Sequence, residues 1–147
     1  MKRNPLIVTP GNRNAALSVL GTNVTVLVSN NHSEDLQITL QSGQEGSGPP
    51  PHNHDWDESF YVIRGEVRFS CDGETKTCGA GTLVHVPAGT IHGFSYGSGG
   101  GEMLEITGRQ SNAIRMFSAL DREIDPEHLE ISKIAQVAGV YGVAFHL

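Results

Sequence analysis

Short segments in which apolar and polar residues alternate, each ended by a turn, constrain the fold of this chain most. The segment 17–29 is rich in β-branched residues on both sides of a turn at 21–23. In the segment 35–41, Leu36, Ile38 and Leu40 alternate with Gln37, Thr39 and Gln41. A period of two residues is that of a β-strand with one buried face. With 18 glycines and 7 prolines in 147 residues, the sequence predicts short strands joined by tight turns.

The rest of the chain divides into a β part and a helical part. After Arg109 the apolar spacing becomes helical, and Ile114, Phe117 and Leu120 fit one short helix. A second helix is expected to begin at Asp125-Pro126, with Asp125 as its N-cap, and to end near Gly139. We expect one domain over 1–147, mainly β, with a barrel core at 16–108 and a helical extension at 112–139. The expected later strands are 61–70, 75–86, 91–96 and 103–106, and 97–101 is expected to be a flexible hairpin loop.

Composition excludes several classes of partner. The formal net charge is -6, and no stretch gathers Lys and Arg into a patch, so nucleic acid is not expected to bind. Pro5 and Pro10 interrupt what would be the apolar segment of a signal peptide. No later run approaches the roughly 18 apolar residues of a membrane span. We therefore expect a cytoplasmic protein whose ligand is a small molecule.

Three histidines and a glutamate have the spacing of a metal site. His52 and His54 are two residues apart, so an extended strand places both imidazoles on one face, and Glu58 has the same parity. His92 follows the turn at 87–89 and begins a strand that can lie beside the first. This donor set suits iron, manganese, nickel, cobalt, copper or zinc, whereas magnesium and calcium prefer oxygen. The sequence predicts one divalent transition metal, and four protein ligands leave two octahedral positions open.

The same residues resemble the two motifs of the cupin superfamily. The first motif is matched by Gly46, the run 52–54, Glu58 and Gly65, and the second by the run from Gly81 to His92. The Asn that is often found four positions after the histidine of the second motif is Tyr96 here. The resemblance implies a double-stranded β-helix, or jelly-roll, barrel in which His52, His54, Glu58 and His92 bind the metal. It also implies a homodimer, because such cupins commonly pair.

Within that superfamily, the stretches 48–54 and 58–66 are similar to the small single-domain cupins described as quercetin dioxygenase-like. In that group the metal binds a flavonol-type enolate and oxygen. The resemblance therefore gives Glu58 a second role, as the catalytic base that accepts the substrate hydroxyl proton.

The residues near the matched strands have alternative interpretations. Asp55 and Asp57 have the wrong parity for the interior and are expected to face solvent. Trp56 either stacks on a ligand at the barrel mouth or packs on a neighbouring subunit. Five further side chains form either an apolar substrate pocket around the metal or ordinary barrel core. These five residues are Phe60, Val62, Phe94, Tyr96 and Met103.

Three functions remain open. The first is a dioxygenase acting on a small enolisable or aromatic compound. The second is a metal-dependent isomerase, cyclase or lyase that needs no oxygen. The third is a module that binds a small molecule without changing it. The sequence contains no nucleophile elbow and no cysteine motif, so metal chemistry is the only catalytic proposal that it supports.

Overall fold

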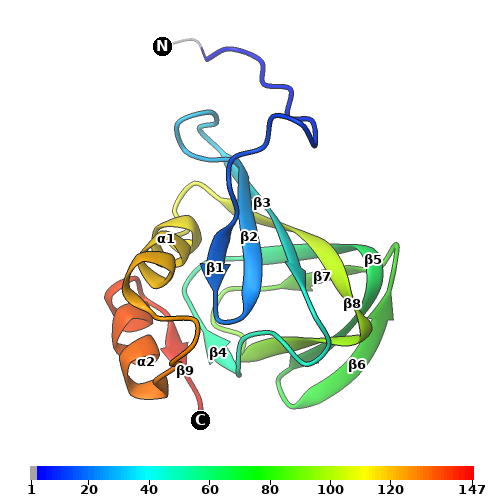
Figure 1. Cartoon of the computed structure of the whole chain (residues 1–147), viewed down its shortest axis with the longest axis vertical. Coiled ribbons are helices and arrows are strands. Elements are labelled where there is room, and N and C mark those ends of the chain that lie inside the picture. Colours follow the sequence, from blue (N-terminus) through cyan, green and yellow to red (C-terminus); the bar gives the residue numbers. More distant parts are fainter. Residues whose placement is uncertain (1–2) are drawn as a thin grey trace.

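The computed structural model describes residues 3–147 and shows strands wrapped into a barrel, with two helices against one side (Figure 1). The mainly β barrel with C-terminal helices that the sequence predicts is confirmed. The strands are β1 (Leu17–Val19), β2 (Thr22–Val28), β3 (Leu36–Gly43), β4 (His52–Asn53), β5 (Glu58–Cys71), β6 (Glu74–Gly79), β7 (Leu83–Val86), β8 (His92–Gly108) and β9 (Ala144–Phe145). The helices are α1 (Ala113–Glu123) and α2 (Ile131–Val140).

The long strands β5 and β8 form the centre of the sheet. They pair antiparallel with each other, from Glu58 beside Thr107 to Cys71 beside His92. β5 also pairs with β6 and β7, and β8 also pairs with β3 and β4. Because both strands are long and strongly bent, the sheet curls back over one interior. The short strand β4 also belongs to this sheet and lies between β8 and β9.

The glycine run at 97–101 is not a loop, which corrects one sequence prediction. It lies within the continuous strand β8, where Gly101 pairs with both Gly43 and Gly65. A Cβ at Gly65 would meet the main-chain oxygen of Gly100, and a Cβ at Gly101 would lie 2.9 Å from the Tyr96 ring. The glycines are therefore needed where neighbouring strands and a buried ring come close together. The expected strand 75–86 is likewise divided, into β6 and β7.

The interior face of β3 is polar. Gln37, Thr39 and Gln41 are at most 4% exposed. On the opposite face Leu36 is 48% exposed and Leu40 is 7% exposed. The face that hydrophobicity alone disfavours is therefore the more deeply buried one. On β8, Glu105 and Thr107 are also buried. The barrel wall therefore presents a polar stripe to its interior, which requires polar partners inside.

Two apolar clusters flank this stripe. One fills the closed part of the barrel, where Val62, Val67 and Met103 are completely buried. The other joins the β1–β2 hairpin to the helical extension. Its buried members are Val19, Val24, Ala113, Met116, Phe117, Leu120, Ile124, Ile134, Ala138 and Val143.

The helical extension follows the sequence prediction at its start and departs from it later. α1 contains Ile114, Phe117 and Leu120 as expected. The second helix begins at Ile131, so the predicted start at Asp125-Pro126 is wrong. The Asp125 carboxylate accepts the main-chain N–H of Glu127 at 2.9 Å, which forms a local turn in place of a helix cap. α2 ends one residue past the predicted stop, Gly139.

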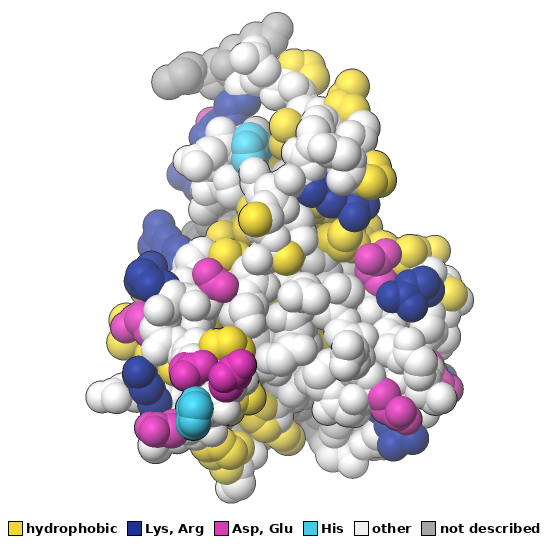
Figure 2. Space-filling model, in the orientation of Figure 1, with side chains coloured by type: hydrophobic (Ala, Val, Ile, Leu, Met, Phe, Trp, Pro, Cys, Tyr) yellow, Lys and Arg dark blue, Asp and Glu magenta, His cyan; other side chains and the backbone are white. Residues whose placement is uncertain are grey.

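On the face seen in Figure 2, acidic side chains lie near several of the Lys and Arg side chains. No helix within residues 3–147 has the length and apolar character needed to cross a membrane.

Candidate metal centre

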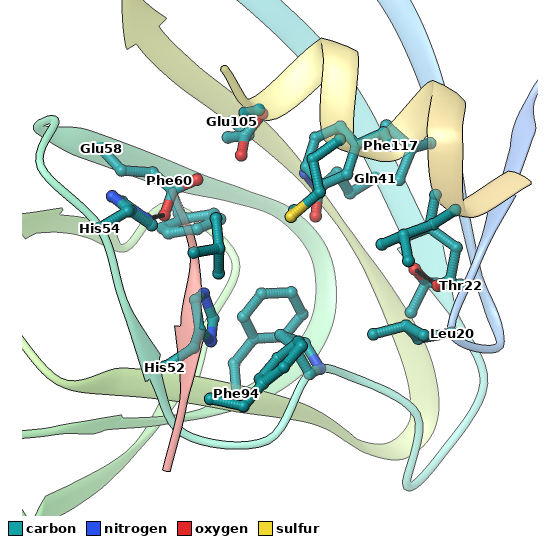
Figure 3. A pocket seen from close by; sticks show the side chains of 18 of the residues that line it. Leu20, Thr22, Gln41, His52, His54, Glu58, Phe60, Phe94, Glu105 and Phe117 are labelled. Carbon is teal, nitrogen blue, oxygen red and sulfur yellow. Dashed lines mark hydrogen bonds and ion pairs between the residues drawn. The ribbon is translucent and has the colours of Figure 1, made fainter. Parts of the chain in front are cut away.

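The structure brings the four residues that the sequence singles out to one point. His52 begins β4, His54 follows that strand, Glu58 begins β5 and His92 begins β8. His52 and His92 are direct cross-strand partners. One donor atom from each of the four residues lies within 4.8 Å of the others. Figure 3 shows His54 and Glu58 side by side, with His52 pointing into the same space.

The proline run before His52 contributes to its orientation. Prolines have no N–H, so the residues 49–51 donate no hydrogen bond to a sheet, and their carbonyl groups remain available as acceptors. The Pro50 carbonyl accepts a hydrogen bond from Nδ1 of His52 at 2.8 Å. The sequence immediately before the ligand therefore fixes the rotation of its ring.

The turn before His92 is bonded to the segment that carries His54. Gly89 has a φ of +85° and donates its main-chain N–H to the His54 carbonyl at 2.8 Å. The Asp57 carboxylate accepts the main-chain N–H of Ala88 at 2.9 Å. Asp57 is exposed, as expected. Its hydrogen bond also connects the segment that carries His54 and Glu58 to the turn before His92. These bonds set the distance between the two parts of the ligand set.

All three imidazoles have the same hydrogen-bond pattern. Nδ1 of His54 lies 3.0 Å from the Trp56 carbonyl, and Nδ1 of His92 lies 2.9 Å from the Thr90 carbonyl. Nδ1 of His52 has a carbonyl partner too. A carbonyl oxygen only accepts, so each Nδ1 carries the proton, and in a neutral ring Nε2 keeps a lone pair. This is the second hydrogen bond typical of metal-binding histidines.

The lone pairs converge on a carboxylate. Nε2 of His54 lies 3.2 Å from Oε1 of Glu58, and Nε2 of His92 lies 3.0 Å from the same oxygen. Lone pairs that face one another in a buried site repel unless a cation lies between them. Protons or a metal ion can supply that charge, and three nitrogens with one oxygen form a donor set for a transition metal. The residues present therefore fit a single ion, and metal binding itself remains a prediction.

Burial and neighbouring charges shift the acid–base properties of these groups. Burial, together with His92, lowers the pKa of His52 to about 4, which keeps its ring neutral. Burial opposes the charged form of His92, but the hydrogen bond and charge of Glu58 raise its pKa above the usual value. Burial alone would raise the pKa of Glu58, yet hydrogen bonds with Glu105, His54 and His92 hold it well below its usual range.

Trp56 packs within its own chain. Its indole ring stacks on the His54 imidazole, with ring centroids 4.2 Å apart and an angle of 10° between the planes. This contact holds the His54 ring from one side. Trp56 also lines the cavity next to the cluster, and the two alternatives left open by the sequence, stacking on a ligand and packing on a neighbouring subunit, both stay predictions.

An apolar cavity adjoins the metal cluster. It contains about 600 Å³ of empty space, part of which is open to solvent. His52, His54 and Glu58 line one wall, and Met116 and Phe117 of α1 line another. Figure 3 shows Phe117 across the cavity from Glu58 and His54. The helical extension therefore covers the open end of the barrel, and it forms part of the ligand-accessible surface.

The five residues proposed as a substrate pocket separate into two groups. Phe60 and Phe94 line the cavity. Val62, Tyr96 and Met103 do not line it and are packed in the closed part of the barrel, with exposures of 2% or less. They share the inward parity of the strands, but they lie farther along them, beyond the aromatic side chains that bound the cavity.

Sequence reasoning missed several cavity residues, above all Glu105. Glu105 is 2% exposed, lines the cavity beside Glu58, and accepts a hydrogen bond from the Thr39 hydroxyl at 2.9 Å. Burial, followed by the charge of Glu58, raises the pKa of Glu105 well above the usual value. One signal could have found it, since Glu105 is two residues from Met103 and therefore shares its inward face. Gln41, Met116 and Phe117 were missed as well.

Part of the chain matches a known family model. Residues 38–107 match the model of the cupin domain. This stretch includes all four candidate ligands. No curated protein is similar enough to the chain to count as a match.

Solved structures share the fold at low sequence identity. An RmlC-like cupin from Shewanella frigidimarina is 20% identical with a TM-score of 0.64, and the match covers 74% of this chain and 95% of that one. KdgF from a Halomonas species is 17% identical with a TM-score of 0.68, covering 76% and 99%. The polyketide cyclase RemF from Streptomyces resistomycificus is 23% identical with a TM-score of 0.62, covering 74% and 80%. At these identities the likeness shows the fold alone.

Proposed function

We propose that this chain, which carries a cupin domain and the cupin fold, is a metal-dependent enzyme that acts on a small, largely apolar compound. One observation carries the proposal. The imidazoles of His52 and His54 and the Glu58 carboxylate form one wall of a cavity whose other walls are mostly apolar. A reactive polar wall inside an apolar cavity is the usual character of a small-molecule site.

The side chains of the site have separable roles in this proposal. A transition metal, when bound, polarises a substrate oxygen and favours its enolate form. Glu58 accepts the proton of the substrate hydroxyl, for which its low pKa leaves it ionised. The rings of Phe60, Phe94 and Phe117 offer apolar faces to an aromatic or enolic ligand and exclude water from it.

The leading reaction class is oxygen-dependent cleavage by a dioxygenase. It follows from the similarity of residues 48–54 and 58–66 to the quercetin dioxygenase-like cupins. A dioxygenase places both atoms of O₂ in the product, and the substrate supplies the electrons, so no added reductant is required. The apolar cavity is compatible with a flavonol-type or diketone substrate.

An oxygen-independent reaction is the second candidate, and Glu105 favours it. A second buried carboxyl group beside Glu58 places two carboxyl groups at one cavity wall, with pKa values shifted in opposite directions. An isomerase, cyclase or lyase needs a proton removed at one position and returned at another. One of the structures with the same fold is a polyketide cyclase.

Oxygen consumption separates the candidates. The protein is loaded in turn with iron, manganese, nickel, cobalt, copper or zinc, and O₂ uptake is recorded with a panel of flavonols and β-diketones. Uptake matched by substrate loss supports the dioxygenase, whereas turnover that persists in anaerobic buffer supports the second candidate. Recovery of unaltered compound with every metal would reject both and would leave a module that only binds its ligand. The His92→Ala variant, tested in parallel, controls for free metal in solution.

A further inference from the structure

A row of buried polar side chains leads from the barrel wall to the candidate metal centre, and the four ligands do not account for it. Thr39 on β3 is the direct cross-strand partner of Glu105 on β8. Glu105 is 2% exposed and Thr39 is completely buried. Burying polar groups opposes folding unless each one is hydrogen bonded, and apolar residues here would avoid that cost. The row therefore calls for a functional explanation.

The hydrogen bonds in this row are consecutive and have one direction. Nε2 of Gln41 donates to Oγ1 of Thr39 at 3.3 Å. The Thr39 hydroxyl, with its single hydrogen, donates to Oε1 of Glu105 at 2.9 Å. Glu105 in turn faces Glu58, because its cross-strand partner Phe60 is two residues from Glu58 on the same face of β5, and both carboxyl groups line the cavity. The contact between the two carboxyl groups lowers the pKa of Glu58. The series starts on β3, crosses β8 and ends at the candidate ligand on β5.

Glu58 is in a position where such support matters. It is the first residue of β5, where it pairs with Val86 of β7 and Thr107 of β8. The chain just before it bends at 55–56, so no strand residue directly precedes it. Two imidazoles contact its Oε1, which leaves the carboxylate free to rotate unless a further bond holds it. Groups that orient a metal ligand typically change metal affinity by about 10- to 100-fold when they are removed.

We propose that Glu105, held in place by Thr39 and Gln41, is a positioning residue that orients the Glu58 carboxylate for metal binding. The inference rests on the proposed function, because it requires that Glu58 binds the ion. It assigns a role to Glu105 that is distinct from direct ligation. Glu105 is not among the four residues whose donor atoms meet at one point, and its Oε1 is bonded to Thr39.

The test is a Co²⁺ titration of metal-free protein, followed by its visible absorption spectrum, which reports ligand geometry. Glu105→Gln keeps an N–H that can bond Glu58 and an oxygen that can accept from Thr39, so its affinity should stay within a few-fold of the natural protein. Glu105→Leu keeps neither bond and should weaken Co²⁺ binding by about 10- to 100-fold, with an altered spectrum. Thr39→Val preserves shape and should give a smaller loss of the same sign.

Gln37→Leu is the matched control. Gln37 is buried on the same face of β3, but it donates to the main-chain oxygens of Gly108 and Ser111 and lies outside the row. This variant should lose stability and keep its Co²⁺ affinity.

The outcomes separate this inference from the proposed function. Absence of Co²⁺ binding by the natural protein would overturn both. Tight binding by Glu105→Leu with an unchanged spectrum would overturn the positioning role alone. A Glu105→Gln variant as weak as Glu105→Leu would also overturn it, because the negative charge, as in direct ligation, would then be what matters. If Glu105→Leu does not fold, Thr39→Val decides by the same two measurements.

Discussion

The two halves of β5 face the same barrel interior, and their surroundings are opposite in character. In the first half, Glu58 and Phe60 face the metal cluster and the cavity. In the second half, Val67 and Phe69 are packed in a closed apolar core. Three phenyl rings lie at the boundary, with the Phe60 centroid 5.1 Å from Phe69 and 5.5 Å from Phe94. One strand therefore serves both a reactive site and a structural core.

The difference shows how the barrel tolerates a polar interior. Buried histidines and carboxyl groups contribute little to stability and are costly unless they are fully paired. The closed half buries apolar side chains and supplies the stability that the open half lacks. We therefore expect substitutions in the open half to affect metal binding, and substitutions in the closed half to affect folding.

The largest expected effect is the loss of the ion from a single ligand substitution. His92→Ala removes a 1% exposed imidazole that contacts Glu58, and the metal content should fall to background while the barrel stays folded. Elemental analysis of dialysed protein, with circular dichroism, measures both. His85→Ala is the matched control, since His85 is exposed on β7. Metal retained by His92→Ala would contradict the ligand assignment.

A truncation in the closed half should have the opposite signature. Phe69 is 3% exposed, and Phe69→Ala should lower the free energy of unfolding by about 3–5 kcal/mol, because a cavity replaces a packed ring. Urea denaturation gives the free energy, and elemental analysis should show unchanged metal in the folded protein. Arg68→Ala, on the exposed side of the same strand, should change stability by less than about 0.5 kcal/mol. Loss of metal from folded Phe69→Ala would break the division between the halves.

The smallest effect is expected at Tyr96. Its hydroxyl is buried and has no hydrogen-bond partner among the described residues, and the ring packs between Gly43 and Gly101. Tyr96→Phe removes an unpaired polar atom, so the free energy of unfolding should rise by about 1 kcal/mol or stay unchanged. Tyr61→Phe, at an exposed tyrosine on β5, is the reference. A clear loss of stability in Tyr96→Phe would show that a buried water pairs with the hydroxyl.

The candidate metal cluster could be predicted from the sequence because three of its four members lie close together in the chain. His52, His54 and Glu58 share one parity, and the turn at 87–89 marks the start of the strand with His92. Glu105 belongs to no motif, so its shared parity with Met103 is the one sequence signal for it, and it meets Glu58 only through the pairing of β5 with β8. Parity of a strand gives two faces, and only the folded barrel decides which one is inside.

Two further differences have the same physical origin. Glycines usually mark loops, but at 97–101 they permit close strand contacts, which a single sequence does not reveal. In β3 the polar face is inside because the stripe meets Glu105 and the site, while Leu36 remains on the outside.

Exposed Tyr61 and Leu83 are cross-strand partners on the outer surface of the barrel. The homodimer implied by the cupin resemblance stays a prediction, and that surface is the place to test it.

The short strand β9 gives the end of the helical extension direct access to the first ligand. Phe145 pairs with His52, the His146 N–H donates to the Pro51 carbonyl at 2.8 Å, and the His146 ring contacts Asn53. A tag, a fusion or a binding protein that pulls residues 144–146 away would release one edge of β4 and loosen His52, a candidate metal ligand. Purification handles therefore belong at the N-terminal side, because Leu6 and Ile7 are exposed. The segment before β1 lies at the end of the molecule opposite β9 (Figure 1).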